Sequence, residues 1–500
     1  MFPCRSMKKL LFFIGILLST GLIAAPRYEF TPLAIKAYRA ILALRLSEAT
    51  ASIVQMRLTD PENLMSYYLE DYIETIIIFL DEDKNAYRKY SPNKDKRLLK
   101  LASGPRDSPY FLYTQAEINL HWAIARVKFG EHLSSVREAS AAYKLLVRND
   151  KLFPDFIANK KTISTLRAIF GSVPPEYRWA TNLLTGIDGD VERGRRELEE
   201  VVKYTQQHSF VFGDETHMVY AFTLLYLGNQ PEESWNVISR SNLKPGKSIL
   251  ASLAIANVGL KSGHASEVAG MLANAPRGKN YFSVPLIDYY LGVAKLTLLD
   301  ENADKYLLDF LRTVKGKTAV KEALQKLAWY ELIHDRESMY WHYMQRCKSE
   351  GTSVAEGDKA ALREANSGIK PDAWLLKARL LFDGGQFERA LTVINQKQKA
   401  DYSHNKAHQL EYTYRMARIQ HKLGRLAEAI LLYKQTINEG KDDPYVYACN
   451  SAFQLGSIFE QKSDFGQAQR YYQMCISINP AEYASGLHQK AKAGLNRVGG

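Results

Sequence analysis

Apolar residues recur every three to four positions along most of the chain from residue 31 onward, with polar residues between them. This spacing is typical of amphipathic α-helices, and no sustained alternation with a period of two indicates β-strands. Short segments containing Gly, Pro, Asn or Asp interrupt the helical pattern. The sequence therefore predicts an all-α protein built from consecutive helices.

The helical pattern repeats every 39 residues near the C-terminus. Small residues occupy two equivalent positions in three copies, and a turn-forming residue lies between them. The first position is Ala378, Ala417 and Gly456, the second is Ala390, Ala429 and Ala468, and the turn is Gly385, Gly424 and Ser463. A period of about 20–50 residues indicates stacked helical hairpins, because one hairpin cannot bury its own apolar face. We expect an α–α superhelix, or solenoid.

Residues 371–482 resemble the tetratricopeptide repeat, in which bulky, small and aromatic residues recur at fixed offsets around a turn. The best copy runs from Cys449 to Glu482, with Leu455, Gly456, Phe459, Phe465, Ala468, Tyr472, Cys475 and Pro480 in register. The resemblance implies a helical-repeat scaffold that binds protein or peptide partners without a cofactor. The usual repeat has about 34 residues, so the additional residues predict longer helices or longer turns between repeats.

In that family the first helix of each repeat lines a groove. Position by position, the resemblance places eight residues there: Leu375, Arg379, Phe382, Tyr414, Arg418, His421, Asn450 and Phe453. Arg379 and Arg418 are one repeat apart and should lie along one wall. Mixed aromatic and cationic groups suit an extended peptide or a polar helix, with Arg binding carboxylates. The alternative is a solvated helix face without a ligand.

A second resemblance covers residues 30–215. The segments 116–130 and 171–198 are similar to a eukaryotic tetratricopeptide family associated with inclusion-body clearance. We take only the helical-repeat fold from this resemblance, because the N-terminus of the chain departs from an intracellular family.

The N-terminus has the order of a bacterial secretory signal. Lys8 and Lys9 precede an apolar run over residues 10–23, and Ala24 and Ala25 follow. Translation could start at Met1 or Met7, and cleavage could follow Ala24 or Ala25, or the segment could remain as an anchor. Because the apolar run follows Cys4, that cysteine is not a lipoprotein cysteine. We expect export to the periplasm or outer-membrane periphery of a diderm bacterium.

We expect four segments along the chain: a signal peptide at 1–25, divergent helical repeats at 26–347, a polar linker at 348–370, and a tetratricopeptide domain at 371–500. The linker is proposed because residues 348–370 are rich in Gly, Ser, Glu and Lys.

The chain is mildly basic, with 66 Lys and Arg against 54 Asp and Glu and a net charge of +12. No block of five or more Lys or Arg is present, which argues against nucleic acid as a partner. Peripheral association with a membrane remains compatible with a diffuse basic surface. Cys347, Cys449 and Cys475 include no CxxC pair, and we expect them to be buried thiols.

No enzyme motif is found in the sequence, and we predict no catalysis. The segment 246–248 lacks the earlier glycine of a phosphate-binding loop and is expected to be a surface turn. His404, His408 and Glu411 have a spacing that could place metal ligands on one helix face, but exposed side chains at a helix start explain them better.

Three functions follow, in order of preference. The first is an exported scaffold that binds other envelope proteins. The second is an envelope protein that binds glycan or peptide on a helical-repeat base. The third is an unrecognised hydrolase whose acid or nucleophile would be assembled across repeats.

Overall fold

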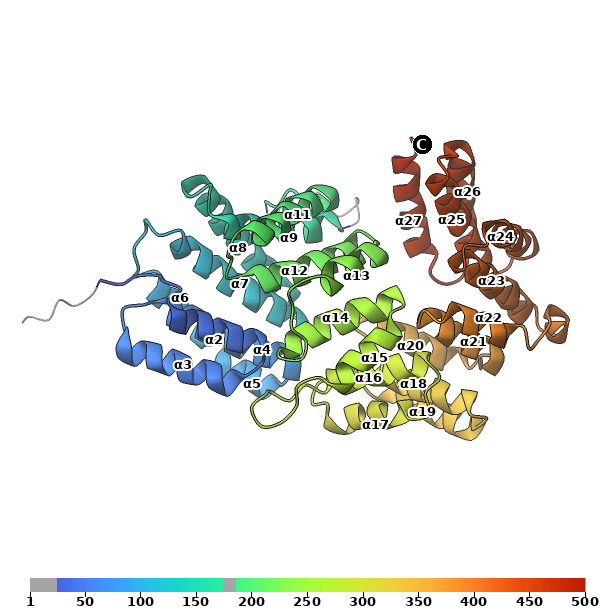
Figure 1. Ribbon diagram of the computed structural model, residues 1–500, viewed down its shortest axis with the longest axis horizontal. Coiled ribbons are helices and arrows are strands. Elements are labelled where there is room, and N and C mark those ends of the chain that lie inside the picture. Colours follow the sequence, from blue (N-terminus) through green and yellow to red (C-terminus); the bar gives the residue numbers. More distant parts are fainter. Residues whose placement is uncertain (1–24, 174–185, 500) are drawn as a thin grey trace, which may run out of the picture. The chain divides into compact units, whose positions relative to one another are not determined.

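The computed structural model describes residues 25–173 and 186–499 (Figure 1). These residues divide into two compact units. Unit 1 comprises the described residues up to Phe79 and from Lys84 to Val201, and unit 2 comprises Leu80–Asp83 and the residues from Val202 onward. Apart from residue 25, the expected signal peptide lies outside the described residues. Within the described ranges the chain is helical, with one isolated β-bridge between Arg27 and Asn63. The all-α prediction is confirmed.

Unit 1 is centred on a buried carboxylate that connects three helices. Asp71 is inaccessible to solvent and accepts hydrogen bonds from Trp122 Nε1 at 2.9 Å and from His121 Nδ1 at 3.0 Å, and Arg97 lies 3.5 Å away. A buried charge is stable only when it is paired and hydrogen-bonded, so these contacts fix the helix packing. The helices are α2 (Pro32–Leu42), α3 (Leu46–Thr59), α4 (Met65–Asp81), α5 (Lys84–Tyr90), α6 (Asn93–Leu101), α7 (Tyr110–Lys128), α8 (His132–Leu152), α9 (Ile157–Gly171) and α11 (Val191–Gln207).

Unit 2 is a series of helical hairpins followed by a final helix. Each hairpin has a first and a second helix, and an additional helix, α20, follows α19. The elements are α12 (Gly213–Phe222) with η1 (Thr223–Leu227), α13 (Pro231–Ser239), α14 (Ile249–Ser262), α15 (Ala265–Ala273), α16 (Leu286–Thr297), α17 (Ala303–Thr313), α18 (Val320–Ile333), α19 (Glu337–Ser349), α20 (Glu356–Ser367), α21 (Ala373–Asp383), α22 (Phe387–Ile394), η2 (Lys399–Tyr402), α23 (Lys406–Lys422), α24 (Leu426–Gly440), α25 (Val446–Gln461), α26 (Phe465–Ser477) and α27 (Ala484–Arg497).

The hairpins of unit 2 share one turn geometry. A residue with positive φ lies between the two helices of each hairpin, at positions 229, 263, 299, 335, 385, 424 and 463. The last three are the turn residues that the 39-residue period predicts. The first four are 34–36 residues apart, so the repeat continues upstream without a matching sequence signature. Positions 335 and 385 are 50 residues apart, and the segment between them includes α20.

The first helices form an inner layer. Successive first helices from α14 to α25 contact one another, whereas the second helices pack against the first helix of their own hairpin and, in most hairpins, also against the first helix of the next. The small residues that the period identifies lie at these contacts, and Ala378, Ala417 and Ala468 are fully buried. At Gly456, an added Cβ would lie 2.5 Å from the ring of Tyr472. Close approach of the helices therefore requires small side chains there.

The expected linker at 348–370 is wrong, because most of it forms α20. Ala361 and Ala365 are buried in the same core as α18 and α19. Asp358 is inaccessible to solvent and accepts hydrogen bonds from the backbone N–H groups of Ala319 and Glu322, at 2.8 and 3.1 Å. The segment is thus a structural part of its hairpin, and its polar residues cap the start of α18.

The structure also places no domain boundary near residue 348. Helix α21 contacts α16 and α18 directly, and Leu376 and Leu380 of α21 belong to the core cluster that includes α18. The two compact units instead divide the chain near residue 201.

Replacing Asp358 tests the role of α20. Asp358→Ala should lower the free energy of unfolding by about 2–4 kcal/mol, because two buried N–H donors lose a charged acceptor. Urea denaturation followed by far-ultraviolet circular dichroism measures the change. Asp442→Ala is the control, since Asp442 is an exposed loop residue. Equal urea midpoints for the two variants would show that the contact between α20 and α18 does not contribute to stability.

Candidate partner-binding surface

A row of polar and aromatic side chains follows the first helices of unit 2, and we call it the inner strip. At its N-terminal end, Tyr226 donates to Asn257 at 2.7 Å, and Asn257 donates to the Tyr290 hydroxyl at 3.0 Å. Burial, chiefly, raises the pKa of Tyr290 to about 12, so this end is uncharged. The inner strip comprises Tyr226, Asn257, Tyr290, Lys326, Trp329, Arg379, Glu411, Arg415, Arg418 and Tyr447.

Three arginines converge on a small cleft at the centre of this strip. The cleft lies between α21 and α23, is lined by Ala378, Arg379, Phe382, Arg415, Arg418 and Ile419, and encloses no space large enough for a water molecule. Apolar contact beside cationic groups is the environment in which a guanidinium binds a carboxylate most strongly. A partner would therefore contact the rim of the cleft rather than fill it.

The three arginines differ in how far their charge is neutralised. Arg415 Nε donates to Glu411 at 2.7 Å, and Arg379 lies 3.6 Å from Asp383. Burial alone would raise the pKa of Glu411, but the Arg415 guanidinium outweighs it and the pKa is lowered. Arg418 lies 4.2 Å from the centre of the Phe382 ring, and within the described ranges no carboxylate pairs with it. Arg418 is therefore the cation available to a ligand.

Lys326 adds a positive charge next to the cleft. Its Nζ lies 3.8 Å from the centre of the Trp329 ring, and the Arg379 guanidinium lies 4.7 Å from the same ring. Burial lowers the pKa of Lys326 to about 8, with Arg379 and Lys261 also lowering it and Glu322 opposing the shift. An incoming carboxylate would raise this pKa and further favour the ammonium form of Lys326.

The turns of distant hairpins contact each other, and we call this side of unit 2 the turn edge. An added Cβ at Gly385 would lie 1.9 Å from the Gly263 carbonyl oxygen. Gln386 and Arg389 donate to the Ser266 hydroxyl and the Leu298 carbonyl at 3.2 and 3.0 Å, and Lys422 and Glu232 form an ion pair at 3.0 Å. These contacts therefore tie together hairpin turns that are far apart in the sequence.

Comparison with protein families identifies the last two hairpins before α27. Tetratricopeptide repeat models match residues 413–445 and 450–482. These hairpins are tetratricopeptide repeats. No curated protein matches the chain. The remaining predicted copy, which begins at residue 371 and contains α21 and α22, lies outside the matched residues. Its turn nevertheless has the same geometry, with Gly385 at φ 79°. Such repeats generally mediate protein–protein interactions and are typically non-catalytic, which supports an interaction scaffold.

The additional residues of the 39-residue repeat lengthen the turns between repeats in one case and the helices in another, and the sequence analysis allowed both. In the hairpin α21–α22 they lengthen the connection to the next repeat, which contains η2. In the following repeat they lengthen the helices, since α23 has 17 residues and α24 has 15.

The structure brings Arg379 and Arg418 together at the cleft, and their part in binding a partner stays a prediction. Leu375, Phe382 and Tyr414, which the resemblance places in the groove, are largely buried, with 1%, 9% and 5% of their surface accessible. Each faces the neighbouring helix of the tetratricopeptide array: Leu375 and Phe382 belong to the core of α21 and α22. The Tyr414 ring packs 5.4 Å from that of Tyr447. Only Phe382 also reaches the cleft.

The remaining predicted residues lie away from the cleft. The His421 ring meets the Tyr433 ring edge-on, and burial, with Lys422 and Arg418, lowers its pKa, so it is neutral at pH 7. Asn450 accepts from Gln454 at 3.3 Å. Phe453 packs 6.0 Å from the Tyr472 ring. Their part in binding a partner stays a prediction.

Arg415 and Lys326 were not predicted. The position of Arg415 is occupied by the buried Leu376 one repeat earlier, so the period gives no sign of a cation there. A usable signal is the spacing of Glu411 and Arg415, which are four residues apart on one helix and form an ion pair. Lys326 lies upstream of the strict repeat, where no register was available.

Other candidate sites do not assemble. No cluster of three metal-binding side chains is present in the described part of the chain, and Glu411 faces Arg415 rather than His404 or His408. Gly246 and Lys247 form an exposed turn, as predicted. Among the described helices none has the length and apolarity to cross a bilayer.

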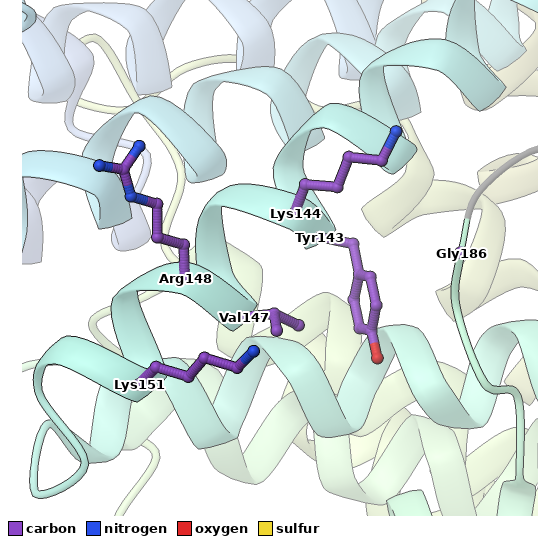
Figure 2. Close-up of a pocket in the computed structure, with 6 residues that line it drawn as sticks. All are labelled: Tyr143, Lys144, Val147, Arg148, Lys151 and Gly186. Carbon is purple, nitrogen blue, oxygen red and sulfur yellow. The ribbon is translucent and has the colours of Figure 1, made fainter.

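An open depression in unit 1 offers no convergent chemistry. It is lined by Tyr143, Lys144, Val147, Arg148 and Lys151 of α8 and by Gly186. Figure 2 shows that the two lysines and the arginine extend from one helix in different directions and do not point toward one atom. A single exposed helix face of this kind is an ordinary solvated surface.

The depressed pKa of Lys326 gives a test of the cleft's electrostatics. Since the folded pKa lies below that of the unfolded chain, the unfolded state binds more protons between about pH 8 and 10.5, and this residue makes stability rise with pH there. Lys326→Met should therefore stabilise the protein by about 1–3 kcal/mol at pH 7 and by much less at pH 10.5. Urea denaturation at both pH values measures the difference. Lys462→Met, at an exposed position, should change stability equally at both.

Proposed function

We propose that this protein is an exported scaffold that binds protein partners in the bacterial envelope through unit 2 and catalyses no reaction itself. The observation that supports this best is the convergence of Arg379, Arg415 and Arg418 on one cleft in the inner strip of a tetratricopeptide array. The cleft offers positive charge and apolar contact, and it has no acid, nucleophile or metal cluster suited to chemistry.

The rim of the cleft suits an Asp or Glu side chain of an extended partner segment. Arg418 stacks on Phe382 and has free guanidinium edges, because ring contact occupies only its face. Two parallel N–H donors of one guanidinium can bind both carboxylate oxygens, which fixes the orientation of the partner as well as its charge. Neighbouring partner residues would then follow the strip toward Lys326 in one direction and Tyr447 in the other.

Export is supported by the N-terminal sequence. The order of Lys8-Lys9, the apolar run and Ala24-Ala25 is that of a secretory signal. The predicted compartment is the periplasm or the outer-membrane periphery, and a diffuse positive charge is compatible with a peripheral position near anionic envelope components.

Glycan binding is the second candidate, and the geometry of the strip argues against it. Sugar recognition uses open aromatic faces, but Trp329 is only 3% accessible, and Lys326 and Arg379 lie against its ring. A protein partner with an acidic segment fits the charges better.

Affinity purification from envelope fractions after mild crosslinking tests the proposal. The wild-type chain should recover a stoichiometric protein partner, and Arg379→Glu combined with Arg418→Glu should reduce the recovery at least about tenfold, because a carboxylate would meet like charge. Raising the salt concentration should weaken binding in the same way.

The matched control is Lys434→Glu combined with Arg470→Glu. It makes the same change in net charge at exposed positions of the second helices α24 and α26. This variant should recover the partner as well as the wild type does. Equal loss in both double variants would mean that net charge, and not the cleft, determines binding. Retention on a glycan resin without any protein partner would contradict the scaffold function.

A further inference from the structure

Two buried thiols face each other inside the last tetratricopeptide hairpin. Cys449 on α25 and Cys475 on α26 are both inaccessible to solvent, and their Sγ atoms lie 3.6 Å apart. A disulfide needs a separation of about 2 Å, so only about 1.5 Å remains to be closed. Cys449 Sγ also donates to the Cys475 carbonyl oxygen at 3.4 Å, which keeps the side chain directed toward α26.

We infer that Cys449 and Cys475 are a modification site: they form an intramolecular disulfide that joins α25 to α26 when the chain meets a disulfide donor. The inference does not depend on the partner or the compartment proposed above. It goes beyond the sequence-based expectation that these cysteines are buried thiols, which the structure confirms.

The third described cysteine shows that this arrangement is specific. Cys347 is also buried, but its Sγ donates to the Lys321 carbonyl oxygen, and in the described ranges no second thiol lies beside it. Burial raises the pKa of Cys347 to about 11, which leaves it protonated and unreactive. The contact with Cys475, in contrast, lowers the pKa of Cys449.

The position of the pair in the array determines which part of the protein the disulfide would stabilise. Repeats stabilise one another through their neighbours. The hairpin α25–α26 packs against α24 on one side and against the single helix α27 on the other. A cross-link between residues 449 and 475 restricts the unfolded hairpin and so opposes its local opening.

The oxidation proceeds by thiol–disulfide exchange with a donor such as glutathione disulfide or the active-site disulfide of a thiol oxidase. The Cys449 thiolate attacks one donor sulfur and forms a mixed disulfide, and one donor sulfur leaves as a thiol. The Cys475 thiolate then attacks Cys449 Sγ, the new bond forms, and the second donor sulfur leaves. Two electrons and two protons pass from the cysteine pair to the donor, which is reduced to two thiols.

Refolding in glutathione buffers tests the inference, because both thiols are accessible to glutathione while the chain is unfolded. The full chain is refolded from urea in oxidised or in reduced glutathione, free thiols are alkylated, and the chain is digested with trypsin without reduction. Mass spectrometry of the monomer should find the peptides 442–462 and 471–490 joined after oxidation. The oxidised protein should melt about 3–8 °C higher than the reduced one.

Single variants separate the bond from the packing of the thiols. Cys449→Ser and Cys475→Ser should each remove the linked peptides and the dependence of melting on glutathione, whereas Cys347→Ser should retain both. The comparison of oxidised with reduced wild type needs no variant and is independent of any cost of substitution. Glutathione adducts or free thiols at both positions in the refolded, cooperatively melting chain would overturn the inference, as would linked peptides without a change in melting.

Discussion

Close approach of helices at small side chains is the constraint on which unit 2 depends. The ring of Tyr472 lies between Gly456 of α25 and Gly494 of α27, and an added Cβ at either glycine would come within 2.5 Å of it. The same kind of contact brings each first helix against its neighbours, so the inner layer exists because those positions are small. The inner strip and its cleft are consequences, since side chains from α21 and α23 can meet only when their helices nearly touch.

The strict repeat could be predicted from sequence because its turns and small residues are chemically distinctive. Gly385, Gly424 and Ser463 all have positive φ, as the period implies. Upstream the geometry is the same, but the spacing of the turns changes to 34–36 residues, and one of them is occupied by Leu299, a residue type that carries no turn signal. The helix α20 was missed for a related reason. Its buried face consists of two alanines and the carboxylate of Asp358, a pattern that is too polar to distinguish from a linker.

The candidate site was predictable only in part. The proximity of Arg379 and Arg418 follows from the period, because the two residues occupy equivalent positions of adjacent repeats and their long side chains extend along the same surface. The period does not tell which adjacent position faces the inner strip and which faces the next helix, and a shift of one residue rotates a helical position by about 100°. Tyr414 was therefore assigned to the surface although it is buried, while Arg415, the next residue, lines the cleft.

The contacts along the turn edge determine how the array responds to force. Helical-repeat arrays stretch like springs when each repeat touches only the adjacent ones. Here Gly385 rests on Gly263, and Lys422 pairs with Glu232 across 190 residues of chain. Pulling on the two ends of unit 2 must break these cross-ties before the intervening hairpins can separate. The C-terminal hairpin is tied in a similar way, since the Arg363 guanidinium of α20 lies 5.0 Å from the centre of the Tyr483 ring. A partner pulling on the protein would therefore load several distant contacts together instead of extending one hairpin at a time.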